Sequence, residues 1–374
     1  MYNVLNDCQI VCDRINVENN KDIQMLFYDK VVFITGGGGS IGRELCRKIL
    51  HYKPKKVVVF DMNELSLFTM SNDFLKEITN NIVTLTLGSI LDYELLEHVF
   101  QACHPSIIIH AAAYKHVSIA EKNPSEAIKC NVLGTLNMLN ISMASGIKHF
   151  IYLSSDKAVN PTSVMGMTKR ISEMLVKYFN SLSPNYYTSV RFGNVFRSSG
   201  SVSEIFIEQL ITKKKITITH PDMERYFMSI NDAVNLILSS AVLYNEGDLF
   251  LCDMKQSIKI TDLAKKMMMM LGIDDHEVEI QYTSVRDGES LFEELCYSTE
   301  SLRKSSITNI YICESNDEYN NILESVYDLL QHLFTGNLLH YIRRIVPQYK
   351  VEKQSHLHNQ EIYSENRNED VINE

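Results

Sequence analysis

Short apolar runs alternate with helical patterns over residues 30–190. The apolar runs suit strands that are buried on both faces, and they lie at 30–35, 55–61, 81–88, 105–112 and 148–155. Between them, apolar residues recur at helical spacing in 41–52, 62–78, 91–102 and 124–146. This alternation predicts right-handed βαβ units and an α/β fold of Rossmann type, with a doubly wound parallel sheet covered by helices.

The alternation loosens after residue 190. A further strand at 186–195 and a helix at 231–244 are followed by shorter pieces, which predicts a smaller interleaved lobe over the carboxyl edge of the sheet. The predicted division of the chain is a lead-in at 1–27, a Rossmann unit at 28–195 with 230–252 returning to it, a substrate-binding lobe at 196–229 and 253–349, and a disordered polar tail at 350–374.

Composition excludes several classes of protein. Hydrophobic residues make up 45% of the chain and charged residues 22%, which is typical of a globular protein. The net charge of −10 lacks the positive field that non-specific nucleic-acid binding needs. No apolar run approaches about 18 residues and no secretory signal begins the chain, so we expect a cytoplasmic protein without membrane contact. The eight scattered cysteines and the histidine spacing predict reduced thiols and no metal site.

A glycine-rich turn follows the first predicted strand. Glycine permits a tight turn and close approach of the backbone to a dinucleotide pyrophosphate, which then lies at the N-terminus of the next helix. Asp61 ends the second strand about 20 residues later, where a carboxylate holds ribose hydroxyls and repels a 2′-phosphate. NAD is therefore favoured over NADP. The predicted cofactor-binding residues of this region are Thr35, Gly36, Gly38, Gly39, Ser40, Ile41, Gly42 and Asp61, joined at later strand ends by Ser89, Ile90, Ala111, Ala112 and Ala113.

Polar residues also follow the fifth predicted strand. Ser155, Asp156 and Lys157 come directly after it, and Met165 and Lys169 lie a short distance downstream. An adjacent Asp and Lys usually form an exposed ion pair, but the carboxyl end of a central strand faces the cofactor crevice. This position favours a role for Ser155, Asp156 and Lys157 in catalysis.

The segment resembles extended short-chain dehydrogenase/reductases, in which a strand-end Ser or Thr is followed by Tyr-x-x-x-Lys. Met165 stands at the tyrosine position here, and Lys169 is kept. The Asp156-Lys157 pair resembles one branch of that superfamily, the UDP-N-acetylglucosamine 4,6-dehydratases of the polysaccharide-biosynthesis group. Other segments that resemble this branch are 110–117, 121–124, 131–135, 191–195, 199–202, 219–226 and 346–349.

The resemblance covers about residues 14–349, with two departures in the segment Arg286-Asp287-Gly288-Glu289. The family has Arg-Pro-Gly-Glu followed by Lys, whereas this chain has Asp287 and Ser290 at the Pro and Lys positions. Many relatives carry a membrane domain before this region, so we expect this chain to be a soluble version.

The resemblance implies a dehydration that recycles its cofactor. Hydride leaves C4 of the sugar for NAD, and the resulting ketone acidifies the proton on C5. A base removes that proton, an acid assists loss of the C6 hydroxyl, and hydride returns to C6. The implied product is a UDP-2-acetamido-2,6-dideoxy-hexos-4-ulose for amino-deoxysugar and polysaccharide synthesis. Likeness to the long, membrane-anchored relatives favours retention at C5.

The same resemblance implies roles for individual residues. Asp156 is the candidate acid at C6, and Lys157 is the candidate base at C5, which requires a lowered pKa through burial or the cation of Lys169. Ser155 would bond the C4 hydroxyl, and Lys169 would hold the nicotinamide ribose beside Asn131. Met165 cannot accept a proton, so the C4 hydroxyl proton passes to Asp156 or to an ordered water. Both acceptors stay open at this point.

Further residues are predicted to bind the substrate. Arg225 and Arg286 would clamp the diphosphate, because the guanidinium fork matches phosphate oxygens. Glu289 would bind the uridine ribose. The other predicted substrate-binding residues are Lys115, His116, Asn194, Ser201 and Val202.

Two other functions fit part of the pattern. A nucleotide-sugar 4-epimerase shares the fold, the cofactor and the substrate, but it relies on the tyrosine that Met165 replaces. A non-catalytic NAD-sensing or scaffold protein would explain the missing tyrosine, yet the retained Ser155, Asp156, Lys157 and Lys169 favour an enzyme. Relatives of this fold commonly pair through two helices each, so we expect a homodimer or larger homo-oligomer.

Overall fold

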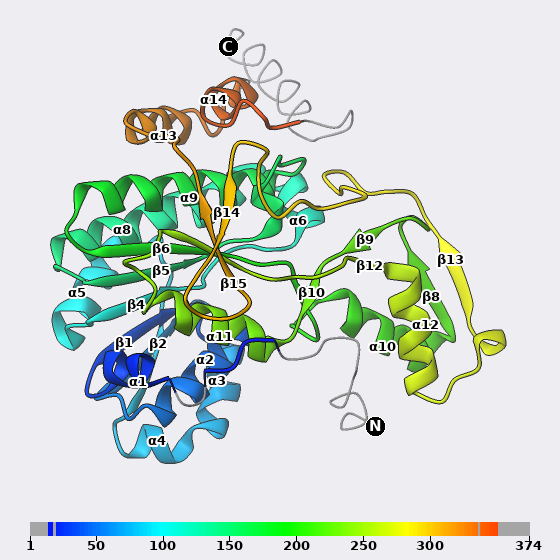
Figure 1. Ribbon diagram of the computed structural model, residues 1–374, viewed down its shortest axis with the longest axis horizontal. Coiled ribbons are helices and arrows are strands. Elements are labelled where there is room, and N and C mark those ends of the chain that lie inside the picture. Colours follow the sequence, from blue (N-terminus) through cyan, green and yellow to red (C-terminus); the bar gives the residue numbers. More distant parts are fainter. Residues whose placement is uncertain (1–13, 18–19, 336, 351–374) are drawn as a thin grey trace, which may run out of the picture.

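A nine-stranded sheet forms the centre of the molecule (Figure 1). The computed structural model describes residues 14–17, 20–335 and 337–350. Across the sheet the strands are β14 (Ser301–Lys304), β15 (Ile310–Glu314), β11 (Leu249–Cys252), β6 (Tyr186–Arg191), β5 (His149–Leu153), β4 (Ile107–His110), β1 (Val31–Thr35), β2 (Lys56–Asp61) and β3 (Val83–Leu87). The strands from β11 to β3 are parallel, whereas β15 and β14 are antiparallel to their neighbours. The predicted α/β fold of Rossmann type is confirmed.

Helices cover both faces of the sheet because its central strands are apolar on both sides. In β1, Phe33 packs into the core on one face, while Val32 and Ile34 pack into the core on the other. The first face carries α5 (Tyr93–Cys103), α8 (Gly134–Ala144) and α9 (Val164–Leu182). The second face carries α1 (Lys21–Phe27), α2 (Ser40–His51), α3 (Glu64–Asp73) and α11 (Ile230–Ser240). The alternating strands and helices of the chain thus form three layers, with the sheet between two layers of helices.

Two predicted helices are interrupted. The helix predicted at 62–78 divides at Phe74 into α3 and α4 (Leu75–Thr79). The helix predicted at 124–146 contains α7 (Pro124–Ile128), a π-helical turn η2 (Lys129–Leu133) and α8. A single π turn within a longer helix is rare, and the helical spacing of apolar residues over 124–146 did not indicate one. The predicted disordered tail lies outside the described residues except for Lys350.

A small lobe stands beside the carboxyl edge of the sheet, to the right in Figure 1. It has its own apolar core, which includes Phe206 of α10 and Met267 of α12. Its elements are α10 (Val202–Lys213), β8 (Lys215–Ile218), β9 (Glu224–Arg225), β12 (Ile258–Lys259), α12 (Ile260–Met270), η4 (Asp275–Glu277) and β13 (Glu279–Tyr282). The short strands β7 (Asn194–Val195) and β10 (Phe227–Met228) pair with each other where the chain enters and leaves this lobe.

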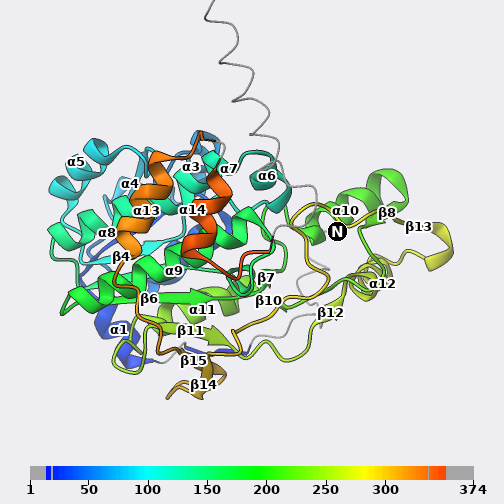
Figure 2. The same cartoon turned by 90° about the horizontal axis from the view of Figure 1, so that it is seen from above.

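Residues 301–345 return to the large unit, whereas the sequence analysis assigned them to the lobe. β14 and β15 extend the sheet next to β11, and α13 (Ile322–Gln331) and α14 (Leu338–Ile345) join the core beside α9 (Figure 2). β14 is exposed along its whole length, so its sequence lacks the apolar run of a buried strand. Only pairing with β15 makes it part of the sheet.

Among the described helices, none combines the length and apolar character needed to cross a membrane. Within the same residues, no three His, Cys, Asp or Glu side chains group closely enough to hold a metal ion.

Candidate active site

The glycine-rich turn between β1 and α2 is built for close backbone contact. Gly36 has φ of 62°, and a Cβ there would lie 2.7 Å from the Cα of Ala112 in the segment after β4. A Cβ on Gly42 would lie 2.5 Å from the Cα of Gly37. Gly39 caps α2, and no side-chain cap bond is found there in the described part of the chain. The first N–H groups of α2 are therefore free to bind an anion such as a diphosphate.

Asp61 lies at the mouth of this turn. Its Oδ2 accepts the backbone N–H of Gly38 at 2.9 Å, and its Oδ1 accepts the N–H of Asn63 at 2.9 Å. On the other side of the turn, Ser40 accepts the backbone N–H of Ser199 at 2.9 Å through its hydroxyl. The turn is thus held between the end of β2 and the loop that precedes the lobe.

A buried hydrogen-bond chain, which the sequence analysis missed, connects the ends of β1 and β4. Thr135 donates to the Asn131 carbonyl at 2.6 Å, so its oxygen accepts from Nε2 of His110 at 3.1 Å. Nδ1 of His110 then accepts from the Thr35 hydroxyl at 2.6 Å, and that hydroxyl accepts the N–H of Ala112 at 3.2 Å. Burial, aided by Lys169, lowers the pKa of His110 to about 3. A neutral histidine therefore fixes the loop after β4.

Asn131 and Lys169 also hold backbone in place. The Asn131 amide accepts the N–H of Tyr114 at 2.8 Å and donates to the Tyr114 carbonyl at 3.0 Å. Lys169 donates to the Leu153 carbonyl at 2.7 Å, and burial lowers its pKa to about 8. Ile90, after β3, is buried against Gly134, and the hydroxyl of neighbouring Ser89 accepts the N–H of Leu91.

Ser155, Asp156 and Lys157 form one compact turn at the end of β5. They lie in and before the short helix η3 (Asp156–Ala158). Oδ1 of Asp156 accepts from the Ser155 hydroxyl at 2.9 Å and from Nζ of Lys157 at 3.0 Å. Asp156 is fully buried, and its Oδ2 has no hydrogen-bond partner among the described residues. One carboxylate oxygen thus accepts two hydrogen bonds, whereas the other is buried and accepts none from the described residues.

Lys157 has further acceptors on two other segments. Its Nζ lies 3.2 Å from Oδ1 of Asn194 and 3.6 Å from Oε1 of Glu293. Burial lowers the pKa of Lys157, but the carboxylates of Asp156 and Glu293 outweigh that effect and raise it above the ordinary value. The lowered pKa that the sequence analysis required is therefore not found in this state. Glu293 was missed because nothing in its local sequence indicates a contact with Lys157.

Met165 occupies the first turn of α9 and is 3% exposed, within the apolar core. A Cβ on the next residue, Gly166, would collide with the Lys157 carbonyl, so the start of α9 packs directly on the turn formed by Ser155, Asp156 and Lys157. The Met165 side chain offers no group that exchanges a proton with a substrate.

The two predicted diphosphate clamps differ in their surroundings. Arg225 is buried and donates to the carbonyls of Ser290 at 2.7 Å and Leu291 at 3.1 Å. It therefore anchors the segment after the predicted Arg286–Glu289 motif. Arg286 is exposed, and its backbone N–H donates to Glu289 at 3.2 Å.

Other predicted substrate residues gather where the lobe begins. Lys115 donates to the Ser199 carbonyl at 2.6 Å, and a Cβ on Gly200 would lie 2.7 Å from the His116 ring. Ser201 and Val202 are the N-cap and first residue of α10. They lie on the same loop that contacts Ser40.

A polar cavity of about 260 Å³ adjoins Lys157. Residues 157–163, the start of α6 (Val117–Lys122) and the segment 288–294 enclose it. Lys157, Asn160, Arg225, Glu289 and Glu293 line it. The cavity therefore brings together charged groups of both signs from η3, β9 and the segment after β13.

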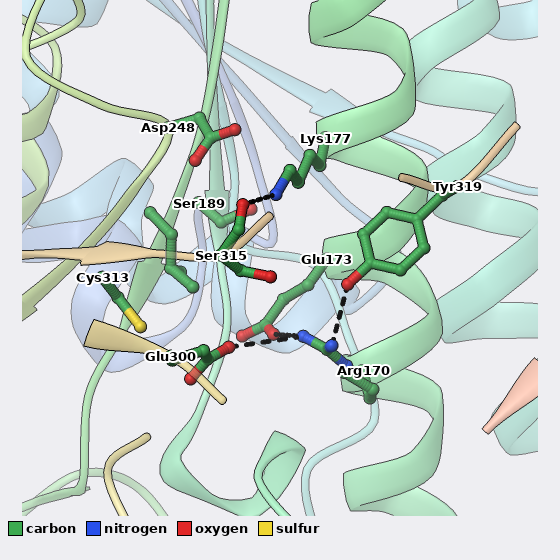
Figure 3. Close-up of a pocket in the computed structure, with 10 residues that line it drawn as sticks. Arg170, Glu173, Lys177, Ser189, Asp248, Glu300, Cys313, Ser315 and Tyr319 are labelled. Atoms are coloured by element: carbon green, nitrogen blue, oxygen red, sulfur yellow. Dashed lines mark hydrogen bonds and ion pairs between the residues drawn. The ribbon is translucent and has the colours of Figure 1, made fainter. Parts of the chain in front are cut away.

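A second, smaller cavity contains a buried network of charges (Figure 3). Figure 3 shows Arg170 directed toward Glu173, Glu300 and Tyr319. Arg191 pairs with Glu173 at 2.8 Å and with Glu300 at 2.9 Å. The cavity measures about 20 Å³, which accommodates a water but no larger ligand. We interpret this network as structural, since it joins α9 to β6 and to the segment before β14.

The family model described as "Polysaccharide biosynthesis protein" matches residues 32–315, the range that contains the turn, the Asp156–Lys157 pair and the cavity. The chain belongs to this family. The predicted membership of the polysaccharide-biosynthesis group is confirmed.

Curated relatives in the family differ in length and name. The probable polysaccharide biosynthesis protein EpsC of Bacillus subtilis is 37% identical over 77% of this chain and 48% of its own length, so the chain spans about half of that relative. A UDP-N-acetylglucosamine 4,6-dehydratase (inverting) of Campylobacter jejuni is 35% identical over 76% of this chain and 83% of the relative. A UDP-glucose 4-epimerase of Rickettsia rickettsii is 32% identical over the same shares.

Among solved structures, Pen from Bacillus thuringiensis is similar to this chain, with a TM-score of 0.71 and 31% identity. The match covers 78% of this chain and 90% of Pen. The family and the fold are thus supported by sequence and by structure.

Proposed function

We propose that this chain is a nucleotide-sugar 4,6-dehydratase that acts on UDP-N-acetylglucosamine with tightly bound NAD. The names of the relatives support a nucleotide-sugar-modifying enzyme of the short-chain dehydrogenase/reductase class. The Asp156–Lys157 pair at the end of a central strand supports the dehydration, which needs one acid and one base beside the sugar.

The unpartnered Oδ2 of Asp156 carries this proposal. A buried carboxylate oxygen without a partner costs free energy, and such a cost persists where a ligand completes the bonds. Oδ1 is already occupied by Ser155 and Lys157, so Oδ2 is the atom that would reach the C6 hydroxyl of the sugar.

The residues at the first strand ends fit NAD. Gly36 and Gly42 leave no room for a Cβ, and the open N-terminus of α2 suits a pyrophosphate. Asp61 would hold the adenosine ribose and disfavour a 2′-phosphate, while Lys169 would hold the nicotinamide ribose. When bound, NAD supplies the acceptor for the C4 hydride and returns that hydride to C6.

The hydrogen bonds of the turn formed by Ser155, Asp156 and Lys157 supply a path for the C4 hydroxyl proton. Ser155 donates to Asp156 at 2.9 Å, so Ser155 can take the C4 hydroxyl proton as it passes its own proton to Asp156. Asp156 becomes a carboxylic acid protonated at Oδ1, and a half-turn of the carboxyl group then presents that proton to the departing C6 hydroxyl, which leaves as water. This path uses Asp156 and no ordered water, and it needs no tyrosine at position 165.

Lys157 would remove the C5 proton and later return it. Once Asp156 is neutral, one of the two carboxylates that raise the pKa of Lys157 is lost, so the pKa falls during the reaction. Lys157 still begins as an ammonium group, and its proton has to leave before it acts as the base.

A 4-epimerase remains the second candidate, because some relatives carry that name. Epimerization needs an acid–base group at the C4 hydroxyl and no acid at C6. The buried Met165 and the Asp156–Lys157 pair therefore favour dehydration.

The test is incubation with UDP-N-acetylglucosamine, with and without added NAD, followed by mass spectrometry. Loss of one water without added cofactor supports the proposal with bound NAD, and loss only with added NAD contradicts tight binding. An isomer of equal mass would identify an epimerase, and an unchanged substrate would contradict both enzymes. NMR of the product then tests the proposed retention at C5, a point of interest because the Campylobacter jejuni relative is named as inverting.

A further inference from the structure

Glu293 lies beside Lys157 in the lining of the same cavity. Its Oε1 lies 3.6 Å from Nζ of Lys157, and its side chain is only 9% exposed. Asp156 holds the same ammonium group at 3.0 Å from the strand end, so Lys157 lies between two carboxylates from distant parts of the chain.

The second cation of this cluster is Arg225. Its Nε lies 3.5 Å from the same oxygen of Glu293, while its other nitrogens hold the carbonyls of Ser290 and Leu291. Two carboxylates and two cations thus balance in charge within a buried group. Because Arg225 has its own backbone partners, the segment carrying Glu293 does not depend on the Glu293–Lys157 contact alone.

Lys157 needs a proton acceptor other than Asp156, which is already used at C6. Asp156 must be free to receive the C4 hydroxyl proton through Ser155, and Asn194 has an amide oxygen that does not hold a proton at neutral pH. Glu293 is the remaining acceptor beside Nζ among the described residues.

We propose that Glu293 is a positioning residue that orients Lys157 and stores its proton while Lys157 acts as the base. This inference rests on the proposed dehydratase function. Burial, together with the neighbouring carboxylate of Asp156, raises the pKa of Glu293 although Lys157 and Arg225 lower it, and this favours uptake of a proton by Glu293.

The proton balance of the cycle is closed. Lys157 passes one proton to Glu293, which leaves a neutral amine and a carboxylic acid. The amine takes the C5 proton while Asp156 gives its proton to the departing C6 hydroxyl. After hydride reaches C6, Lys157 returns a proton to C5, and Glu293 returns the stored proton to Lys157. No outside acid or base is consumed.

Glu293→Gln tests this step, with Glu293→Asp as the conservative variant and Glu314→Gln as the matched control. Glu314 is an exposed carboxylate at the end of β15 that pairs with Arg303 at 2.7 Å and does not line the cavity. In D₂O, Glu293→Gln should slow deuterium uptake at C5 by at least about tenfold, because the acceptor for the Lys157 proton is gone. C4 oxidation, read as absorbance of reduced nicotinamide, should persist. Glu293→Asp should recover part of the rate, and the control should match the wild type.

A second measurement is independent of turnover. The pKa of Lys157 is read by NMR on lysine-labelled protein, with Lys157→Arg to assign the signal. The pKa of Lys157 should fall by about one unit or more in Glu293→Gln, because a carboxylate beside the ammonium group is lost. An unchanged pKa, or equal C5 exchange in Glu293→Gln and its control, overturns the inference. If the wild type does not dehydrate the sugar, the proposed function fails, and the NMR measurement alone still decides the Glu293–Lys157 contact.

Discussion

Asp156 and Lys157 have different surroundings although they are neighbours in the chain. Asp156 is fully buried and has one oxygen without a hydrogen-bond partner among the described residues, whereas Lys157 reaches a polar cavity and has three acceptors. Opposite charges buried together are costly unless each is well paired. Under the proposed function, these different surroundings would let Asp156 serve as the acid and Lys157 as the base.

Substitution of each residue should stop a different step. Lys157→Met should abolish exchange of the C5 proton with D₂O while NAD binding is unchanged, because no amine remains. Asp156→Asn should prevent departure of the C6 hydroxyl. Each variant should lose at least about a hundredfold in kcat, the lower end of typical acid–base catalysis.

Lys122→Met, at an exposed position on α6, is the control for the lysine variant. Deuterium uptake at C5 near the wild-type rate in Lys157→Met would instead assign the base to Asp156 or a bound water.

Met165 is expected to act through packing alone. Its side chain is buried in the core around α9, so Met165→Ala should destabilise the protein by about 2–4 kcal/mol, measured by denaturant unfolding. Turnover per folded molecule should stay within about tenfold of the wild type, because no proton passes through this position. A loss of about 10³ in kcat, or about 4 kcal/mol in transition-state stabilisation, would reveal a positioning role.

At the scale of elements, the start of α9 joins three parts of the site. Its first N–H, at Val164, donates to the carboxylate of Glu121 on α6. A Cβ on Gly288 would lie 2.7 Å from the same carboxylate, so the segment after β13 packs on this junction. Burial, and to a lesser degree Asp287, raises the pKa of Glu121 to about 7. The junction therefore contains a carboxyl group that titrates near neutral pH.

Glu121→Gln should change how stability depends on pH. The pKa of Glu121 is higher in the folded state than in the unfolded state, so the wild type loses stability as pH rises from the ordinary carboxyl pKa of 4.5 to about 7. Between about pH 5 and about pH 8, the free energy of unfolding of Glu121→Gln should therefore rise relative to that of the wild type. The difference should change by up to about 3 kcal/mol. Denaturant unfolding at both pH values measures this difference.

Glu126→Gln, which alters an exposed carboxylate paired with Lys129, should show no such trend. A constant difference between Glu121→Gln and the wild type at all pH values would mean that Glu121 does not titrate in this range.

At the scale of the molecule, α13 and α14 complete the core on the α9 face. Val326 and Leu329 of α13 and Ile342 of α14 are fully buried in the same apolar core as α9. We expect a homo-oligomer from the resemblance, yet this helical pair already covers part of the α9 surface. Pairing of two copies would therefore use other surfaces of these helices or another face of the molecule.

Removal of α13 and α14 should have a large effect. A chain that ends after Glu314 exposes the apolar residues of α9 to water, so we expect aggregation or a markedly lower Tm. A chain that ends at Lys350 keeps both helices and should melt like the full chain. Thermal melting and size-exclusion chromatography compare the three proteins, and an unchanged Tm in the shorter chain would contradict this account of the core.

The central sheet was predictable because β1, β2, β4 and β5 are apolar runs whose burial on both faces leaves a clear signal. Burial on both faces was wrong for β3, which lies at the edge of the sheet and is only partly buried. The addition of β14 and β15 to the sheet was not predictable, because β14 is exposed and forms a strand only by pairing with β15. In the site, the turn at Asp156 was predictable from its place after β5 and from the resemblance. The contacts of Glu293 and of His110 depend on distant partners, which no local pattern indicates.

During synthesis of the chain, Asp156 and Lys157 are made well before the residues that later contact their turn. Asp156 and Lys157 leave the ribosome long before Glu293, and the backbone N–H of Lys350 later donates to the Pro161 carbonyl at 3.1 Å, beside the same turn. A nascent chain that has completed β6 therefore has its reactive groups but neither the carboxylate that faces Lys157 nor this last backbone contact. Products of premature termination should be inert toward the sugar, which would keep unfinished chains from releasing a reactive keto-sugar.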